Sequence, residues 1–162
     1  MTDDHWLDEA IRLAYENVAR GGRPFGALVL REGEVVASAV DRTVQDSDPT
    51  AHAELLALRA ACQKLGTQSL GGTLLATSCE PCLLCQAAAL LAGVVRCIYA
   101  AEQSQAVASG ADPGTAAHEL VLPPAQRQLV LEHRPLALAR VPLDAWHSRQ
   151  QTARLRGVPS PE

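Results

Sequence analysis

The apolar residues of the first twenty positions repeat with the spacing of one helix face. They lie three or four residues apart, and the glycines at 21 and 22 predict where this helix ends. Two short apolar runs follow, over 25–30 and 35–40, and the polar segment between them contains a glycine, which predicts a β-hairpin. The apolar positions of the helix are Leu7, Ala10, Ile11, Ala14, Tyr15 and Val18.

Alternating helical and extended patterns continue to residue 99. A second helix is predicted over about 51–64, a strand over 73–77, a third helix from Pro81 to about 92, and a β-branched strand over 94–99. Pro81 fits the first turn of its helix, where the missing N–H costs nothing. Two strand–helix–strand crossovers imply parallel pairing, with helices on both faces of a mixed sheet. We therefore predict an α/β fold.

The pattern is weaker after residue 100. Helical segments are predicted over 102–109, from Pro123, and over 143–154, and a last strand over 129–132, which 136–138 could extend. No repeat or linker divides the chain, and 162 residues are the size of one ordinary domain. We expect a single domain over residues 1–156 and a disordered tail over 157–162.

Composition and charge limit the kinds of partner that the chain is expected to bind. The formal net charge is -4 and no basic stripe is visible, which argues against a nucleic-acid partner and favours a small uncharged ligand. The first residues lack the pattern of a signal peptide, and the apolar stretch 87–95 is about half the length of a membrane span. We expect a cytoplasmic protein without membrane contact.

Two short clusters carry candidate metal ligands. Pro-Cys-x-x-Cys at 81–85 places Cys82 and Cys85 on one face of a helix start, where the helix dipole stabilises thiolates. His-x-Glu at 52–54 supplies His52. Two thiolates and one imidazole give a zinc ion three protein ligands and leave its fourth position open, as in catalytic sites. The odd count of five cysteines also suits a metal in a reducing compartment better than disulfides.

Glu54 completes this constellation as a candidate acid–base group. Zinc lowers the pKa of a bound water from about 15.7 toward 7, so hydroxide exists at neutral pH. Glu54 lies two residues after the ligand histidine and can carry a proton from that water to the substrate without binding the metal. His-x-Glu followed by Pro-Cys-x-x-Cys is the signature of zinc deaminases that act on nucleobases.

Each feature alone has an ordinary structural explanation. A single Cys-x-x-Cys could be half of a four-ligand structural site or a redox pair. A single histidine is usually a core residue, and a glutamate near a helix start usually complements the dipole. The combination favours a catalytic zinc site, since a redox pair needs no His-x-Glu. Cys62 and Cys97 are expected to be small core residues, whereas Cys79 precedes the zinc helix and either faces the substrate or supplies a third thiolate.

At these residues the chain resembles the cytidine-deaminase-like superfamily, and within it the bacterial guanine deaminases. The similar segments are 22–27, 48–54, 77–85, 99–102 and 142–146, so the resemblance covers roughly residues 7–146. It implies a three-layer α/β/α fold with a five-stranded mixed sheet, and a homodimer that often exchanges its C-terminal segment. The substrate contacts that we expect are Phe25, Gly26, Ala27, Asp41, Ala53, Ser78, Cys79 and Trp146.

The resemblance also implies two catalytic carboxylates. Glu54 is the main proton shuttle, and Asp112 assists the leaving amine. An aspartate before Pro-Gly is otherwise an ordinary turn residue. One position departs from the family, because Asp41 stands eleven residues before the ligand histidine, where these enzymes usually carry asparagine. A carboxylate only accepts hydrogen bonds, so it favours an N–H or hydroxyl and repels a bare ring nitrogen. Asp41 could instead be a loop residue that faces solvent.

These observations lead to one hypothesis and its alternatives. The leading hypothesis is hydrolytic deamination of a small amino-substituted nucleobase, with guanine as the best single candidate and Zn2+ as the cofactor. The alternatives are a tRNA adenosine deaminase, a deaminase of a nucleoside or another N-heterocycle, and a non-catalytic zinc fold. The acidic balance argues against tRNA, because an enzyme that flips a base out of a loop needs cationic contacts around it.

Overall fold

The computed structural model describes residues 2–112 and 115–156. The chain divides into two compact units, residues 1–118 and 119–162, which are described separately. The expectation of a single domain over 1–156 stays a prediction. The expected tail at 157–162 lies outside the described residues. None of the described helices is long and apolar enough to cross a bilayer.

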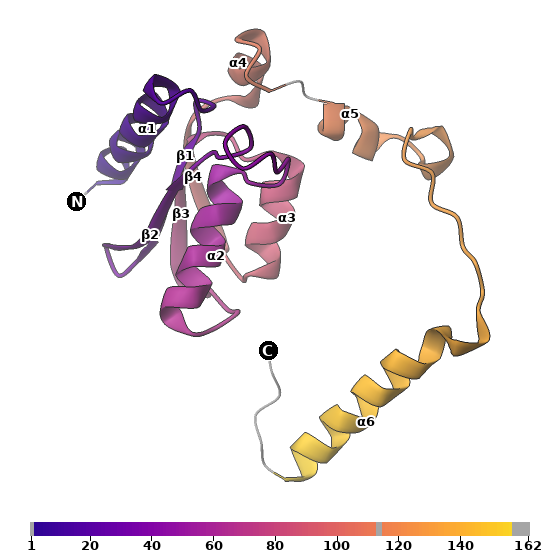
Figure 1. The fold of residues 1–162 in the computed structure, drawn as a ribbon. Coiled ribbons are helices and arrows are strands. Elements are labelled where there is room, and N and C mark those ends of the chain that lie inside the picture. Colours follow the sequence, from indigo (N-terminus) through magenta and orange to yellow (C-terminus); the bar gives the residue numbers. More distant parts are fainter. Residues whose placement is uncertain (1, 113–114, 157–162) are drawn as a thin grey trace. The chain divides into compact units, whose positions relative to one another are not determined.

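The first unit is built on a four-stranded sheet in the order β2-β1-β3-β4 (Figure 1). β1 (Gly26–Arg31) pairs antiparallel with both β2 (Glu34–Val40) and β3 (Thr73–Cys79), and β3 pairs parallel with β4 (Arg96–Ala101). The predicted hairpin is therefore β1–β2. Its turn places Glu32 and Gly33 at φ 55° and 79°, a left-handed pair whose twist matches that of the strands. The mixed sheet of the predicted α/β class is confirmed.

Helices cover both faces of this sheet. α1 (Asp3–Ala19) packs on one face, and α2 (Ala53–Leu65) and α3 (Leu83–Leu91) lie on the other, as Figure 1 shows. Because side chains alternate along a strand, β1 feeds both layers. Leu28 and Leu30 pack with Trp6 of α1, and their neighbours Ala27 and Val29 join the core beneath α2.

Both functional helices begin later than the pattern predicted. The N-cap of α2 is His52 and the N-cap of α3 is Cys82, and both have extended backbone, with ψ of 149° and 168°. Pro81 therefore precedes the helix instead of lying in its first turn, which corrects the prediction. Cys85 is the third residue of α3 and is fully buried. The helix starts nevertheless bring the motif residues to one end of the sheet.

The predicted fifth strand is wrong. Residues 129–136 form no strand, and Leu129, Val130 and Leu131 are 70%, 78% and 74% exposed. An apolar run becomes a strand only when a neighbouring backbone completes its hydrogen bonds, and no described segment pairs with this one. Cys97 was also predicted wrongly as a core residue, because it lies exposed on the edge strand β4. Cys62 is half-buried against the core, as expected.

The remaining described elements are three helices and two 3₁₀ turns. α4 (Gln103–Ala108) follows β4 and begins with a capping box between Glu102 and Gln105. α5 (Thr115–Val121) comes next in the chain. The second unit then contains the 3₁₀ turns Pro124–Gln126 and Ala137–Arg140 and the helix α6 (Val141–Leu155). No residue described between 119 and 156 is buried, although the segment carries many apolar side chains.

Candidate functional site

Three side chains from two helix starts meet at one point. The His52 Nδ1 atom lies 3.7 Å from the Cys82 Sγ atom and 3.5 Å from the Cys85 Sγ atom, and the two sulfurs are 3.7 Å apart. Zinc bonds of about 2.3 Å to sulfur and about 2.0–2.1 Å to nitrogen place tetrahedral ligand atoms about 3.5–3.8 Å apart. The three atoms therefore fit three corners of a zinc tetrahedron, and together they form a candidate metal group.

The protonation of the ligands also suits a cation. The hydrogen bond between the two sulfurs and, to a smaller extent, the hydrogen bond with His52 together lower the pKa of Cys82 to about 4. The same bond, together with burial, raises the pKa of Cys85. The hydrogen bond to Cys82 raises the pKa of His52. A divalent cation stabilises both thiolates and the neutral imidazole, so its binding displaces the protons that these side chains hold.

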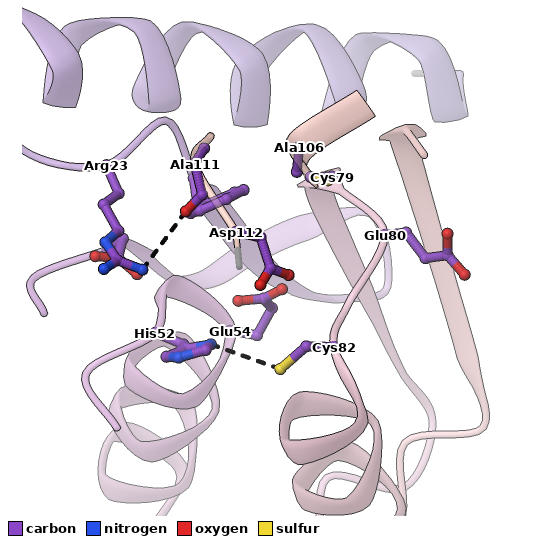
Figure 2. A pocket seen from close by; sticks show the side chains of 11 residues that line it. Arg23, His52, Glu54, Cys79, Glu80, Cys82, Ala106, Ala111 and Asp112 are labelled. Atoms are coloured by element: carbon purple, nitrogen blue, oxygen red, sulfur yellow. Dashed lines mark hydrogen bonds between the residues drawn. The ribbon is translucent and has the colours of Figure 1, made fainter. Parts of the chain in front are cut away.

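Glu54 lies beside these ligands. It is the second residue of α2 and is 8% exposed. Burial raises the pKa of its carboxyl group above the ordinary glutamate value. In Figure 2 the carboxylate lies between His52 and Cys82 and points toward Asp112. A carboxyl group with a raised pKa holds a proton more readily than an ordinary glutamate, which suits a group that accepts and then releases one in general acid–base catalysis.

A pocket opens in front of these residues. It holds about 420 Å³ of space, part of it open to solvent. Its wall combines the metal cluster with loops that follow α1, β2, β3 and α4. The lining residues are Arg23, Phe25, Asp41, His52, Glu54, Cys79, Glu80, Cys82, Ala106, Ala111 and Asp112.

Several expected substrate contacts lie on this wall. Phe25, Asp41 and Cys79 all line the pocket. Asp41 is 2% exposed, so it is not a loop residue that faces solvent. The Cys79 thiol donates to the Glu102 carbonyl at 3.7 Å, and burial raises its pKa, so it stays protonated. Cys79 is not part of the metal group.

Other expected contacts lie behind the wall. Ala27 and Ala53 are fully buried in the core beneath α2. The Ser78 hydroxyl accepts a hydrogen bond from the Gly26 N–H at 3.0 Å. A Cβ atom at Gly26 would lie 2.5 Å from the Ala10 carbonyl oxygen, so this glycine is required for the packing of α1. The structure does not bring these four residues to the pocket wall. Trp146 lies on α6 in the second unit, and its role stays a prediction.

Asp112 is held by a residue that the sequence did not reveal. Its Oδ2 atom accepts a hydrogen bond from the Gln103 Nε2 atom at 3.1 Å. The Gln103 backbone N–H donates to Glu80, also at 3.1 Å. One residue at the start of α4 thus fixes two pocket carboxylates. Arg23, whose guanidinium donates to the Ala111 carbonyl at 3.5 Å, links two further loops of the pocket (Figure 2).

The residues of the site that were not predicted differ in how clearly the sequence indicates them. Glu80 stands inside the strand-to-helix motif and Arg23 inside the segment 22–27, so both lay within recognised segments. Ala106, Ala111 and Gln103 carried no signal, because an alanine has no chemistry of its own. A glutamine that contacts a residue nine positions away leaves no local pattern.

The chain is similar in sequence to known deaminases. The model of the family described as "Cytidine and deoxycytidylate deaminase zinc-binding region" matches residues 1–101. The guanine deaminase of Bacillus subtilis (strain 168) is 36% identical over 149 residues, which cover 91% of this chain and 96% of the relative. The tRNA-specific adenosine deaminase of Aquifex aeolicus (strain VF5) is 37% identical over 62% of this chain and 67% of its own length.

Solved structures agree with these matches. The X-ray structure of the Bacillus subtilis guanine deaminase superposes with a TM-score of 0.86 and covers 91% of this chain and 95% of that chain. The structure of NE0047 in complex with 2,6-diaminopurine, at 33% identity, superposes with a TM-score of 0.66 over 68% of this chain and 62% of that chain.

Proposed function

The chain belongs to the cytidine and deoxycytidylate deaminase family and is a zinc-binding hydrolytic deaminase, and from this premise we propose that its substrate is a small aminopurine, with guanine as the leading candidate. The observation that carries the proposal is the pocket in which a zinc-binding triad, a buried non-ligand glutamate and a second carboxylate share one wall. Hydrolysis there replaces the C–NH₂ bond of the substrate with a C–O bond and releases ammonia.

His52, Cys82 and Cys85 would hold the zinc ion, which supplies a water molecule that ionises near neutral pH. Glu54 takes the proton from the attacking water and donates it to the ring nitrogen next to the reacting carbon. The same carboxyl group then moves a proton to the amine as it leaves. Burial of Glu54 excludes bulk water and raises its pKa, so it can hold this proton between the two transfers.

Asp112 has a second role in this proposal. It is an acceptor hydrogen-bonded to Gln103, it lines the same pocket as Glu54, and in Figure 2 the Glu54 carboxylate points toward it. We assign it to the amino group that leaves, because a carboxylate can accept a hydrogen bond from that N–H₂ and orient it. Phe25 and Cys79 supply the apolar part of the pocket, against which a planar ring can stack.

Guanine is favoured over tRNA adenosine by two observations. The similarity to a guanine deaminase extends over 91% of this chain and so reaches into the second unit, whereas similarity to the tRNA enzyme covers 62%. In addition, the pocket wall carries four acidic residues and only one arginine, and the chain has a net charge of -4. This charge balance opposes a polyanionic substrate.

Ammonia release from a panel of bases tests the proposal. The zinc-loaded protein is incubated with guanine, 2,6-diaminopurine, adenine, cytosine and a pterin, and we expect the fastest release of ammonia from guanine. A parallel reaction with tRNA, followed by a gel-shift and by inosine analysis, tests the rival substrate. Release from no base would contradict the proposal, and inosine formation in tRNA alone would replace it with the rival.

A homodimer with an exchanged C-terminal segment is part of the same proposal. None of the described residues from 119 to 156 is buried, and Val130, Leu131 and Trp146 are 78%, 74% and 56% exposed. Within the described residues β4 pairs only with β3. Apolar side chains that are covered by no core favour association. Light scattering at micromolar concentration should give twice the chain mass, and a monomer at all concentrations would contradict this.

The cysteines support a cytoplasmic location. All five are free in the structure, and two of them must remain reduced to bind zinc. A reducing compartment preserves this state. Fractionation of cells that express the full chain should place it with cytoplasmic markers, and recovery in an oxidising compartment would contradict this.

A further inference from the structure

Asp41 is held in place by three neighbouring residues. Its backbone N–H donates to the Phe25 carbonyl at 3.0 Å, and its own carbonyl accepts from the Asn17 Nδ2 atom at 2.7 Å. The carboxylate Oδ1 atom accepts two further bonds, from the Thr43 N–H at 3.0 Å and from the Thr43 hydroxyl at 2.6 Å. The side chain cannot rotate without breaking both of the last two bonds.

The second carboxylate oxygen, Oδ2, remains available to a ligand. Among residues 2–112 and 115–156 no donor forms a hydrogen bond with it. Every side-chain N or O atom that is fully shielded in this part of the chain has a partner, so Oδ2 retains some accessible surface. Asp41 as a whole is 2% exposed and lines the pocket that contains His52 and Glu54. Its remaining accessible surface therefore lies in that pocket.

We infer that Asp41 selects the substrate by accepting a hydrogen bond from an N–H group on the five-membered ring of the bound purine. The inference rests on the proposed function. The six-membered ring carries the reacting amine and must face Glu54, which leaves the other ring for Asp41. A carboxylate has no proton to donate, so a bare ring nitrogen at this place meets two lone pairs and is rejected.

Asp41→Asn reverses this selection without changing the shape of the residue. The Thr43 donors still need an acceptor at Oδ1, so they hold the amide oxygen in that place. The amide NH₂ group then occupies the position of Oδ2 and faces the pocket. A donor thus replaces an acceptor on the pocket wall, and it favours a bare ring nitrogen over an N–H.

Two isomeric deaza analogues of guanine test the inference. In 7-deazaguanine the N–H of the five-membered ring is fixed at position 9, and in 9-deazaguanine it is fixed at position 7, whereas guanine can move the proton between them. The unmodified enzyme should prefer one isomer by roughly 10–100-fold in kcat/KM, as a hydrogen bond to a charged group implies. In Asp41→Asn this preference should fall at least about tenfold, with a smaller change for guanine.

Asp48→Asn is the matched control. Asp48 accepts from the Thr50 N–H and hydroxyl in the same manner as Asp41 from Thr43, but it does not line the pocket. It should leave the isomer preference unchanged. Equal turnover of both isomers by the unmodified enzyme would overturn the inference, as would an Asp41→Asn variant that slows all substrates by one factor.

A binding measurement separates this result from the proposed function. Calorimetric titration of both isomers into Glu54→Gln and into Glu54→Gln/Asp41→Asn reports recognition without turnover. If no base is deaminated but the isomers bind with an Asp41-dependent preference, the reaction assignment fails and the Asp41 assignment stands. Absence of such a preference in binding overturns the Asp41 assignment whatever the turnover shows.

Discussion

The metal side of the pocket and its loop side are built in different ways. The metal side, His52, Glu54, Cys82 and Cys85, comes from the starts of two helices that pack on one face of the sheet. The loop side, which includes Asp41 and Asp112, comes from the connections that follow β2 and α4. Helix starts fix side-chain positions through backbone geometry, whereas the loops rely on individual hydrogen bonds. Substitutions on the metal side should therefore abolish the reaction, and substitutions on the loop side should change which substrate reacts and how well.

The largest effect is expected when the metal side loses a ligand. Cys85→Ser removes a fully buried sulfur whose position fits a corner of the zinc tetrahedron. Zinc content should fall well below one per chain, and kcat/KM should fall by more than about 10⁴-fold, since the ionised water and its positioning are lost together. Elemental analysis and ammonia release measure the two quantities.

The exposed Cys97 provides the control for this experiment. It lies on β4 and is not part of the metal group, so Cys97→Ser should retain zinc and activity. Full zinc content in Cys85→Ser would show that the metal side is assembled differently. Loss of zinc in both variants would point to general unfolding, which circular dichroism would reveal.

Glu54→Gln should separate the reaction from metal binding. The amide keeps the size of the buried side chain but can no longer carry a proton. We expect kcat to fall by about 10²–10⁴-fold, with zinc retained. Unchanged turnover of a confirmed substrate would mean that Glu54 has a structural role only. If neither the unmodified protein nor Glu54→Gln turns over any substrate, the non-catalytic alternative gains support.

Gln103→Leu sharpens the comparison on the loop side. It removes a hydrogen bond to the Asp112 carboxylate, and a hydrogen bond to a charged group contributes about 1.5 kcal/mol, so kcat/KM should fall about tenfold. Asp112→Asn should cost at least as much, and adding Gln103→Leu to it should cost little more. The two effects are compared in a double-mutant cycle with guanine as substrate.

Gln105→Leu is the control for the helix itself. Gln105 belongs to the capping box of α4, where its side chain accepts from the Glu102 N–H, so its loss weakens the helix start. If Gln105→Leu slowed the enzyme as much as Gln103→Leu, the stability of α4 would explain the effect instead of the contact with Asp112.

The sequence predicted the metal side better than the loop side for a physical reason. His52, Cys82 and Cys85 lie within short motifs whose spacing alone places them on helix starts. Gln103 donates a hydrogen bond to Asp112 only because the loop between them folds back, and the path of this loop depends on tertiary packing. No local sequence pattern therefore indicates this contact. The prediction of a fifth strand was wrong for a similar reason. A strand needs a neighbouring segment to pair with, and the apolar run at 129–132 does not specify which segment that is.

The smallest effect on turnover is expected for Gly26→Ala. This substitution tests whether the glycine in the segment 22–27 is required for packing or for substrate binding. A Cβ atom there would lie 2.5 Å from the Ala10 carbonyl oxygen and 3.0 Å from the Ala14 nitrogen, so α1 must shift. Gly26→Ala should lower the free energy of unfolding by about 1–3 kcal/mol, with KM unchanged. Gly71→Ala, whose added carbon meets only the Ser69 hydroxyl at 3.7 Å, should be neutral in the same urea titration. A raised KM without loss of stability would instead show that Gly26 is a substrate contact, because its backbone would then lie against the base and not against α1.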